Sequence, residues 1–178
     1  VKLGEYELAF KQYNNADNMT DQFSAFQCLL ESSSPYKEEV IERFYSQHKK
    51  DAQVMDKWFS AQSISSSTSV ADIRKLMKHN LFKMTNPNRI RSVMGSFTQN
   101  SIQFHCKEGY QLATEVILEL DSLNPQIAAR FAGIYNHWRR FIDDYSSLQE
   151  DQLKLILDSH KLTDDVYEIV NTALKGNS

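Results

Sequence analysis

Residues 40–62 read VIERFYSQHKKDAQVMDKWFSAQ, and apolar side chains recur in this stretch at intervals of three and four. An interval of three to four residues places side chains on one face of a helix, whereas a half-buried strand needs strict alternation. The stretch therefore predicts amphipathic helices. Their apolar faces would be formed by Val40, Ile41, Phe44, Tyr45, Val54, Met55, Trp58 and Phe59.

The same periodicity extends in both directions along the chain. Only 5 glycines and 3 prolines punctuate the 178 residues, which leaves little turn chemistry for hairpins of strands. Residues 63–69 and 98–109 are the best candidates for loops. Further helical stripes run through Tyr6, Phe10 and Tyr13, through Phe23, Phe26, Leu29 and Leu30, and through Leu112, Val116, Ile117 and Leu120.

These stripes predict an all-α fold of about ten helices in which residues 1–178 form a single helical domain. Short polar connections between such helices favour antiparallel neighbours. Stacked antiparallel helical hairpins would form a curved superhelix, HEAT-like or armadillo-like, with a concave face. The sequence contains no clean internal repeat, so this prediction concerns architecture alone.

Helix-start signals fall where such helices should begin. Ser, Thr and Asn cap helix N-termini, proline suits the first helical position, and acidic residues favour the first turn. The expected starts are Thr20 capping a helix from Asp21, Ser34 ahead of Pro35, Ser69 with Asp72 as a capping box, and Thr163 ahead of Asp164 and Asp165.

Composition and charge exclude several classes of protein. The chain is 41% hydrophobic, which argues against disorder, and no run approaches the roughly 18 apolar residues of a membrane span. The net charge is −3 and the cations are scattered, so nucleic acid is not an expected partner. Cys28 and Cys106 lack metal-type spacing, and we interpret both as reduced thiols.

No catalytic or metal-binding motif is present. The sequence lacks H-E-x-x-H, C-x-x-C, G-x-S-x-G and a phosphate-binding glycine loop, so it predicts no catalytic residue and no metal ligand. Adjacent carboxylates diverge by about 100° on a helix, and we interpret the three such pairs as solvated faces or helix starts. The isolated histidines are His48, His79, His105, His137 and His160; the acidic pairs are Glu38/Glu39, Asp143/Asp144 and Asp164/Asp165.

The cluster Trp138-Arg139-Arg140 has the composition of a base-stacking patch. A single cluster of this kind in an acidic chain is better explained by internal stacking and salt bridges. We expect that arrangement for both arginines.

Two segments combine a helix start with polar side chains, NPNRIR over residues 86–91 and NPQIAAR over residues 124–130. In each, asparagine would cap the helix and proline would take the first position. The helix-start residues are Asn86, Pro87, Asn88, Asn124 and Pro125. Gln126 and Arg130 are four apart and share a face. A helix N-terminus with arginine and glutamine suits a carboxylate or a peptide carbonyl. Structural capping with internal salt bridges remains the alternative.

At these motifs the chain resembles the helical C-terminal domain of aminopeptidase N type zinc metallopeptidases. The resemblance covers nearly the whole chain in order. It runs through NMTD (18–21), VMDKWF (54–59), NPNRIRS (86–92), FH (104–105), GY (109–110), LNPQ (123–126) with Arg130, and DVYE (165–168).

The resemblance implies a noncatalytic C-terminal fragment of a longer multidomain aminopeptidase. In that family the zinc motif H-E-x-x-H-(x)18-E and the motif G-x-M-E-N lie in an upstream catalytic domain, and neither occurs here. The helical domain packs against the catalytic domain and closes a chamber for peptide substrates. Arg91, Gln126 and Arg130 match chamber-facing positions. The implied cofactor is one zinc ion in the missing catalytic domain, and the implied location is the cytoplasm.

The segment from Phe104 to Tyr110 departs from the family pattern, because bacterial members often carry a longer loop there. A free-standing α-solenoid scaffold that binds a partner protein is the alternative function. A domain made to pack against a larger one should expose an apolar or mixed patch. The upstream coding region distinguishes the two functions, since only an aminopeptidase would encode the zinc motif.

Overall fold

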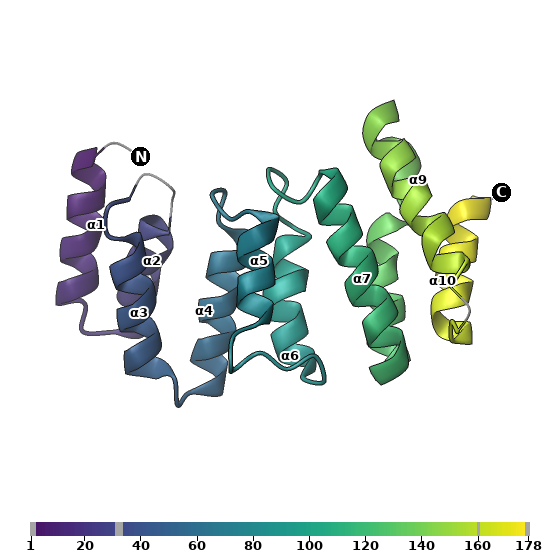
Figure 1. The fold of residues 1–178 in the computed structure, drawn as a ribbon. Coiled ribbons are helices and arrows are strands. Elements are labelled where there is room, and N and C mark those ends of the chain that lie inside the picture. Colours follow the sequence, from purple (N-terminus) through teal and green to yellow (C-terminus); the bar gives the residue numbers. More distant parts are fainter. Residues whose placement is uncertain (1–2, 31–33, 160, 177–178) are drawn as a thin grey trace.

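The computed structural model describes residues 3–30, 34–159 and 161–176, and these residues form ten α-helices and no strand. The predicted all-α fold is therefore confirmed. Figure 1 shows the helices side by side with the two termini at opposite ends of the array. The helices are α1 (Leu3–Asn15), α2 (Met19–Leu29), α3 (Lys37–His48), α4 (Ala52–Ile64), α5 (Val70–Met77), α6 (Pro87–Ile90), α7 (Lys107–Leu123), α8 (Pro125–Ala132), α9 (Asp143–Leu157) and α10 (Asp164–Lys175).

Three short helical turns complete the array. A π-helical turn, η1 (Arg91–Gly95), continues α6 directly. Two 3₁₀ turns, η2 (Gly133–Tyr135) and η3 (Trp138–Arg140), connect α8 to α9.

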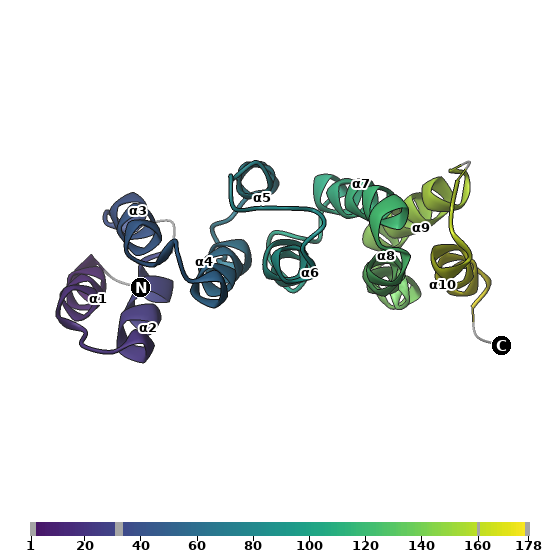
Figure 2. The ribbon, with the colours of Figure 1, turned by 90° about the horizontal axis from the view of Figure 1, so that it is seen from below.

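Apart from α1 at the N-terminal end, the helices form two rows, as the prediction of stacked hairpins requires. Helices α3, α5, α7 and α9 make one row, and α2, α4, α6, α8 and α10 make the other (Figure 2). We call these the odd row and the even row. Helices α4 and α6 are set back from the line between α2 and α8, so the outer side of the even row is concave (Figure 2).

The hydrophobic core lies between the two rows and runs the length of the molecule. In the stretch from residue 40 to 62, the predicted apolar faces of α3 and α4 are buried or half-buried. Aromatic rings join neighbouring helices, as where Phe26 of α2 stacks on Phe44 of α3 with centroids 4.7 Å apart. The largest fully buried side chains are Tyr13, Tyr110, Tyr135, Phe26, Phe44, Phe59, Phe97, Leu29, Leu30, Met55, Ile73 and Ile90.

One predicted helix start is confirmed in full. Ser69 and Asp72 form a reciprocal capping box at the start of α5. The Ser69 hydroxyl accepts the backbone N–H of Asp72 at 3.2 Å, and the Asp72 carboxylate accepts the backbone N–H of Ser69 at 3.1 Å.

The predicted starts at Thr20 and Pro35 are wrong. Helix α2 begins at Met19, because Asn18 caps it and accepts the backbone N–H of Asp21 at 2.9 Å. Helix α3 begins at Lys37, with Tyr36 at the cap position. The Ser34 hydroxyl accepts the N–H of Tyr36 at 3.3 Å, and this local turn places Pro35 ahead of the helix.

At α10 the predicted boundary holds but the capping contact differs. Thr163 occupies the cap position with Asp164 and Asp165 in the first turn. Its side chain makes no hydrogen bond to the helix, and its hydroxyl instead donates to the buried carboxylate of Asp121 on α7.

The two predicted loops are each shorter than expected and contact one another. Helix α4 continues to Ile64 and α7 begins at Lys107. Buried Asn100 donates from its side chain to the carbonyl of Ser65 at 2.8 Å, and Gln103 donates to the carbonyl of Ser66 at 2.6 Å. These contacts hold both loops at the same end of the array. Cys28 and Cys106 carry free thiols.

Candidate functional site

The two Asn-Pro segments begin α6 and α8, which are neighbours in the even row. Asn86 accepts the backbone N–H of Asn88 at 3.0 Å, and Asn124 accepts that of Ile127 at 3.2 Å. Each proline occupies the first turn of its helix. Helices of the even row run in the same direction, so the positive ends of these two helix dipoles lie at one edge of the array (Figure 1).

Arg89 in the first of these segments has a structural position. Its side chain is 93% buried and pairs with Asp56 of α4. Its Nε donates to the carbonyl of Leu81 at 3.1 Å and its Nη1 to that of Ala52 at 3.2 Å. The internal salt bridge that the sequence left open as an alternative is therefore present at Arg89, where it joins α4 to α6.

The π-helical turn η1 begins at Arg91, and it changes the register of the helix there. The backbone N–H of Ser96 bonds to the carbonyl of Arg91, five residues back. A Cβ on Gly95 would lie 3.8 Å from Cβ of Arg91 and 3.9 Å from Cζ of Phe131. Gly95, the last residue of η1, thus faces Phe131 of α8, and a Cβ at this position would make only ordinary van der Waals contacts. Single π turns of this kind occur often at functional sites.

The residues that match chamber-facing positions are all exposed. Arg91 lies on η1, and Gln126 and Arg130 lie one turn apart on α8. Within residues 3–30, 34–159 and 161–176, none of these three side chains has a hydrogen-bond or ion-pair partner. Their donors are free to bind a ligand.

Other surface arginines contrast with this group. Arg43 pairs with Glu39 at 3.0 Å, and Arg74 makes a bidentate pair with Glu115 at 2.7 and 2.9 Å. The first pair lies within α3, and the second joins α5 to α7. Free arginines are therefore a feature of particular positions and not of the whole surface.

A groove of about 520 Å³ lies beside α10 and next to the turns that follow α8. Arg139 lines it, stacks on Trp138 at 4.2 Å and donates to the carbonyls of Ala173 and Leu174. Arg140 is exposed, and no partner is found for it among the described residues. The predicted stacking is present at Arg139. Among the described residues, neither arginine makes the predicted salt bridge, and Arg139 donates instead to backbone carbonyls at the end of α10.

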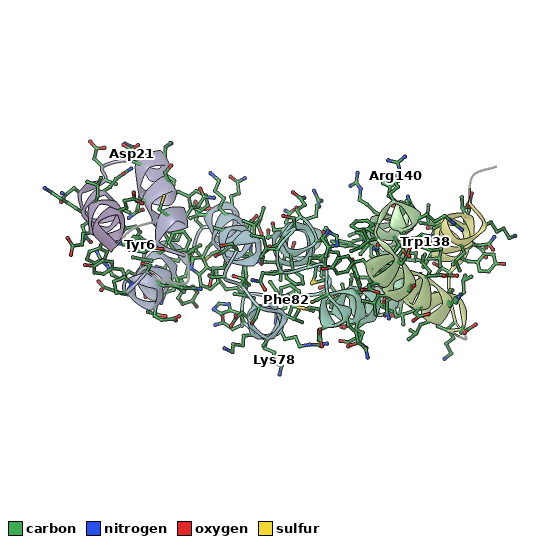
Figure 3. The ribbon with its side chains drawn as sticks, turned by 90° about the horizontal axis from the view of Figure 1, so that it is seen from above. Tyr6, Asp21, Lys78, Phe82, Trp138 and Arg140 are labelled. Carbon is green, nitrogen blue, oxygen red and sulfur yellow. The ribbon has the colours of Figure 1, made fainter. Side chains whose placement is uncertain are left out.

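Arg140 is an exposed cation, whereas the sequence analysis expected it to stack and pair internally. Figure 3 shows its side chain pointing outward on the side of the even row, opposite to Lys78 on the odd side. The sequence could not show which of the two neighbouring arginines points outward. The fold decides this, because Arg139 is the one that contacts the end of α10.

His48, His79 and His105 pack against aromatic rings. Burial, together with the nearby charge of Arg89, lowers the pKa of His79, whose Nδ1 accepts the N–H of Leu81 at 3.2 Å. Burial also lowers the pKa of His105, whose Nδ1 lies 2.8 Å from the hydroxyl of Tyr110. Among the described residues, no three His, Cys, Asp or Glu side chains gather to hold a metal ion. His160 lies outside the described residues.

The abbreviated segment before α7 is compact. His105 faces Tyr110, and the thiol of Cys106 accepts the N–H of Gly109 at 3.3 Å to cap the helix.

No helix in the part of the chain that the structure describes has the length and apolar character needed to cross a membrane.

Comparisons with known proteins agree with this architecture. The chain is 33% identical over 172 residues to aminopeptidase N of Haemophilus influenzae, covering 94% of this chain and 20% of that protein. It is 32% identical over 186 residues to aminopeptidase N of Escherichia coli, covering 98% of this chain and 21% of that protein. The chain thus spans about a fifth of the length of these relatives.

A solved structure has the same fold. The crystal structure of Legionella pneumophila aminopeptidase A in complex with aspartic acid superposes with a TM-score of 0.90 and 29% identity, over 96% of this chain and 20% of that one. The sequence profile of the domain of unknown function DUF3458_C, described as ARM repeats, matches residues 3–175. The chain therefore belongs to the DUF3458_C ARM-repeat family.

Proposed function

We propose that residues 1–178 are a noncatalytic, C-terminal helical domain of a longer, multidomain, zinc-dependent aminopeptidase. Support comes from the aminopeptidase N relatives, of which the chain spans about a fifth. The proposed parent removes N-terminal residues from peptides. Its zinc ion would be held by an upstream catalytic domain, since the described residues of this chain offer no ligand set.

The concave side of the even row is proposed to face the parent's catalytic domain and enclose a peptide chamber. The observation that carries this proposal is a group of exposed side chains that have no partner among the described residues, Arg91, Gln126 and Arg130. Arginine binds carboxylates through two parallel hydrogen bonds, and a glutamine amide suits a peptide group. We assign these residues to binding and steering the peptide and not to bond cleavage.

Enclosure itself would contribute to catalysis in the parent. A peptide held in a chamber meets the catalytic group with part of its translational and rotational entropy already lost. Closure also excludes bulk water from the reacting centre. The free thiols are consistent with a cytoplasmic protein, which we propose as its location.

Hydrolysis of an aminoacyl-anilide and of tetrapeptides with zinc tests the proposal, on this chain alone and on the longer parent. We expect an inactive chain and an active parent. In the parent, Arg91→Ala and Arg130→Ala should raise KM for tetrapeptides about tenfold, because hydrogen bonds to charged groups contribute about 1.5 kcal/mol or more. KM for the short anilide should change little.

Lys78→Ala is the matched control, because Lys78 is an exposed cation on the odd side (Figure 3). It should leave both KM values unchanged. Turnover by this chain alone, or a parent without the zinc motif, would refute the proposal and favour an independent scaffold. Equal effects of Arg91→Ala, Arg130→Ala and Lys78→Ala on KM would refute the assignment of peptide binding to the even row.

A further inference from the structure

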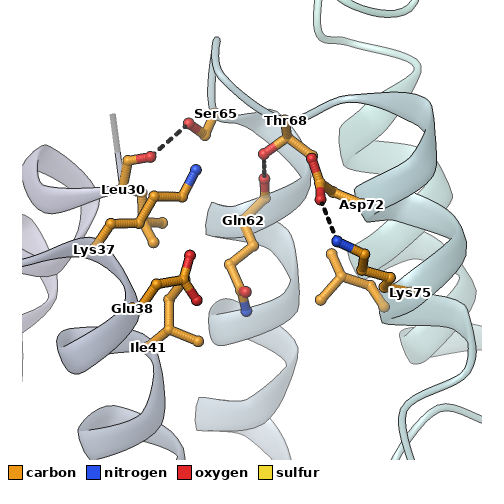
Figure 4. Close-up of a pocket in the computed structure, with 10 residues that line it drawn as sticks. Leu30, Lys37, Glu38, Ile41, Gln62, Ser65, Thr68, Asp72 and Lys75 are labelled. Carbon is orange, nitrogen blue, oxygen red and sulfur yellow. Dashed lines mark hydrogen bonds and ion pairs between the residues drawn. The ribbon is translucent and has the colours of Figure 1, made fainter. Parts of the chain in front are cut away.

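A small pocket opens between α3 and α5, with α4 as its floor (Figure 4). Its volume is about 200 Å³. Sites for drug-sized ligands are roughly 300–1,000 Å³, whereas an apolar cavity of about 150 Å³ accepts benzene. The pocket therefore suits a ligand of about one ring or one amino acid. None of the residues that line the pocket is among those proposed to bind peptide, Arg91, Gln126 and Arg130.

The pocket wall combines an aliphatic surface with charged groups. Leu30, Ile41 and Leu76 supply the apolar part. On each flanking helix the pocket-lining residues lie within four positions of one another, at 37, 38 and 41 on α3 and at 72, 75 and 76 on α5, so one side of each helix forms a wall.

The charges in the wall are balanced in sign but not all paired with one another. Lys75 pairs with Asp72 at 3.2 Å across one side. Lys37 donates to the neutral hydroxyl of Ser67 at 2.9 Å, so its charge has no carboxylate partner in the part of the chain described. Glu38 likewise has no ion-pair or hydrogen-bond partner there.

Lys37 and Glu38 therefore present opposite charges that do not meet each other. Figure 4 shows the Lys37 amine and the Glu38 carboxylate both directed toward the space between the helices. Gln62 also extends into this space, and its Nε2 is engaged with the carbonyl of Trp58 at 3.1 Å, which leaves its amide oxygen as an acceptor.

The two lysines and two carboxylates of the wall sum to no net charge. A phosphate or a metal cation would leave one sign of charge unmatched, whereas a zwitterion would match both. We propose that this pocket binds a free α-amino acid with an aliphatic side chain. Its ammonium group would donate to Glu38 and the Gln62 oxygen, its carboxylate would accept from Lys37, and its side chain would contact Leu30, Ile41 and Leu76.

The inference depends only on the pocket and stands apart from the proposed aminopeptidase function. If both hold, the ligand belongs to the class of product that the parent releases. The two ideas fail separately, because binding is measured on this chain without any hydrolysis.

Amide chemical-shift titration of the 178-residue chain with L-leucine tests the proposal. We expect saturable shifts confined to the C-terminal end of α2, to α3, α4 and α5, and to the turn between α4 and α5. N-acetyl-L-leucine lacks the ammonium group, L-leucinamide lacks the carboxylate and glycine lacks the aliphatic side chain. Each should bind about tenfold more weakly or worse, since each loses one of the three contacts.

Glu38→Gln should weaken leucine binding about tenfold or more. Glu39→Gln is the matched control, because the neighbouring carboxylate pairs with Arg43 and does not line the pocket. Lys37→Met is a second variant and should also weaken leucine binding, because Lys37 is proposed to bind the leucine carboxylate. The absence of saturable shifts up to the solubility of leucine would overturn the proposal, and so would equal binding by the Glu38 and Glu39 variants.

Discussion

The guanidinium of Arg89 on α6 pairs with the carboxylate of Asp56 on α4. The Arg89 side chain is 7% exposed and that of Asp56 is 25% exposed. The hydroxyl of Ser92 donates to the same carboxylate at 3.2 Å. One carboxylate thus fixes α6 and the start of η1 against α4, and Arg91 follows directly on this anchored turn.

Asp56→Ala should lower the free energy of unfolding by about 3 kcal/mol, the lower end for a broken buried ion pair because Asp56 is partly exposed. Urea denaturation measures the change. Arg91→Ala is the control, because it removes an exposed arginine that has no hydrogen-bond or ion-pair partner in the part of the chain that the structure describes. A loss as large for Arg91→Ala as for Asp56→Ala would contradict the assigned roles.

Gly109→Ala should destabilise the chain by about 3 kcal/mol, since overpacking forces the backbone to shift. An added Cβ would lie 2.1 Å from the carbonyl oxygen of Phe104, which is backbone and has no rotamer to adopt. Gly133→Ala is the control, because its nearest neighbour would be Nδ2 of Asn136 at an ordinary 3.6 Å. Thermal unfolding of both variants checks the prediction, which fails if they unfold alike.

Stability should fall as the pH drops below about 6.5, the ordinary pKa of histidine. Burial first, and then the charge of Arg89, lower the pKa of His79 in the folded chain, while Glu42 opposes them. The unfolded chain therefore binds the proton at higher pH, so protonation favours unfolding. A protonated Nδ1 also loses its bond from the N–H of Leu81.

Urea midpoints between about pH 7 and pH 5.5 measure this effect. His79→Phe should flatten the pH dependence in part, and the remainder should come from His105, whose pKa burial also lowers. An unchanged slope in His79→Phe would show that His79 does not contribute.

Asp121→Ala should loosen α10 at a cost of about 2 kcal/mol, since a buried carboxylate that accepts two hydrogen bonds is lost. Asp121 is 4% exposed, and its Oδ2 accepts the N–H of Thr163 at 2.9 Å. Hydrogen exchange should accelerate in α10 more than in α2, at the far end of the array. Glu119→Ala, an exposed change on the same helix, should leave exchange in α10 as it was.

Much of the fold follows from short-range sequence pattern. The spacing of Phe44, Met55 and Phe59 sets the buried face of a helix, and the three-residue spacing of Ser69 and Asp72 sets a cap. Such signals depend on residues within one or two turns of each other, so they can be recognised in the sequence. Even here, the sequence predicted Thr20 as the cap, whereas the structure has Asn18 in that position.

The candidate site was predictable in part. The Asn-Pro pairs indicated the starts of α6 and α8, and resemblance nominated Arg91, Gln126 and Arg130. Nothing in the pattern distinguished buried Arg89 from exposed Arg91 two residues later. The π turn at Arg91–Gly95 was not predicted either, because a single turn is too short to show a period of its own.

The positions of the helices, their order and the family of the chain could therefore be predicted from the sequence alone, because they depend on periodicity, capping and ordered motifs. The partners of charged side chains were decided only by the packing of helices. Arg89 meets a carboxylate 33 residues away, and Arg139 meets carbonyls 34 and 35 residues away. The electrostatic state of each arginine depends on which helices become neighbours, and long-range burial of the core sets that arrangement.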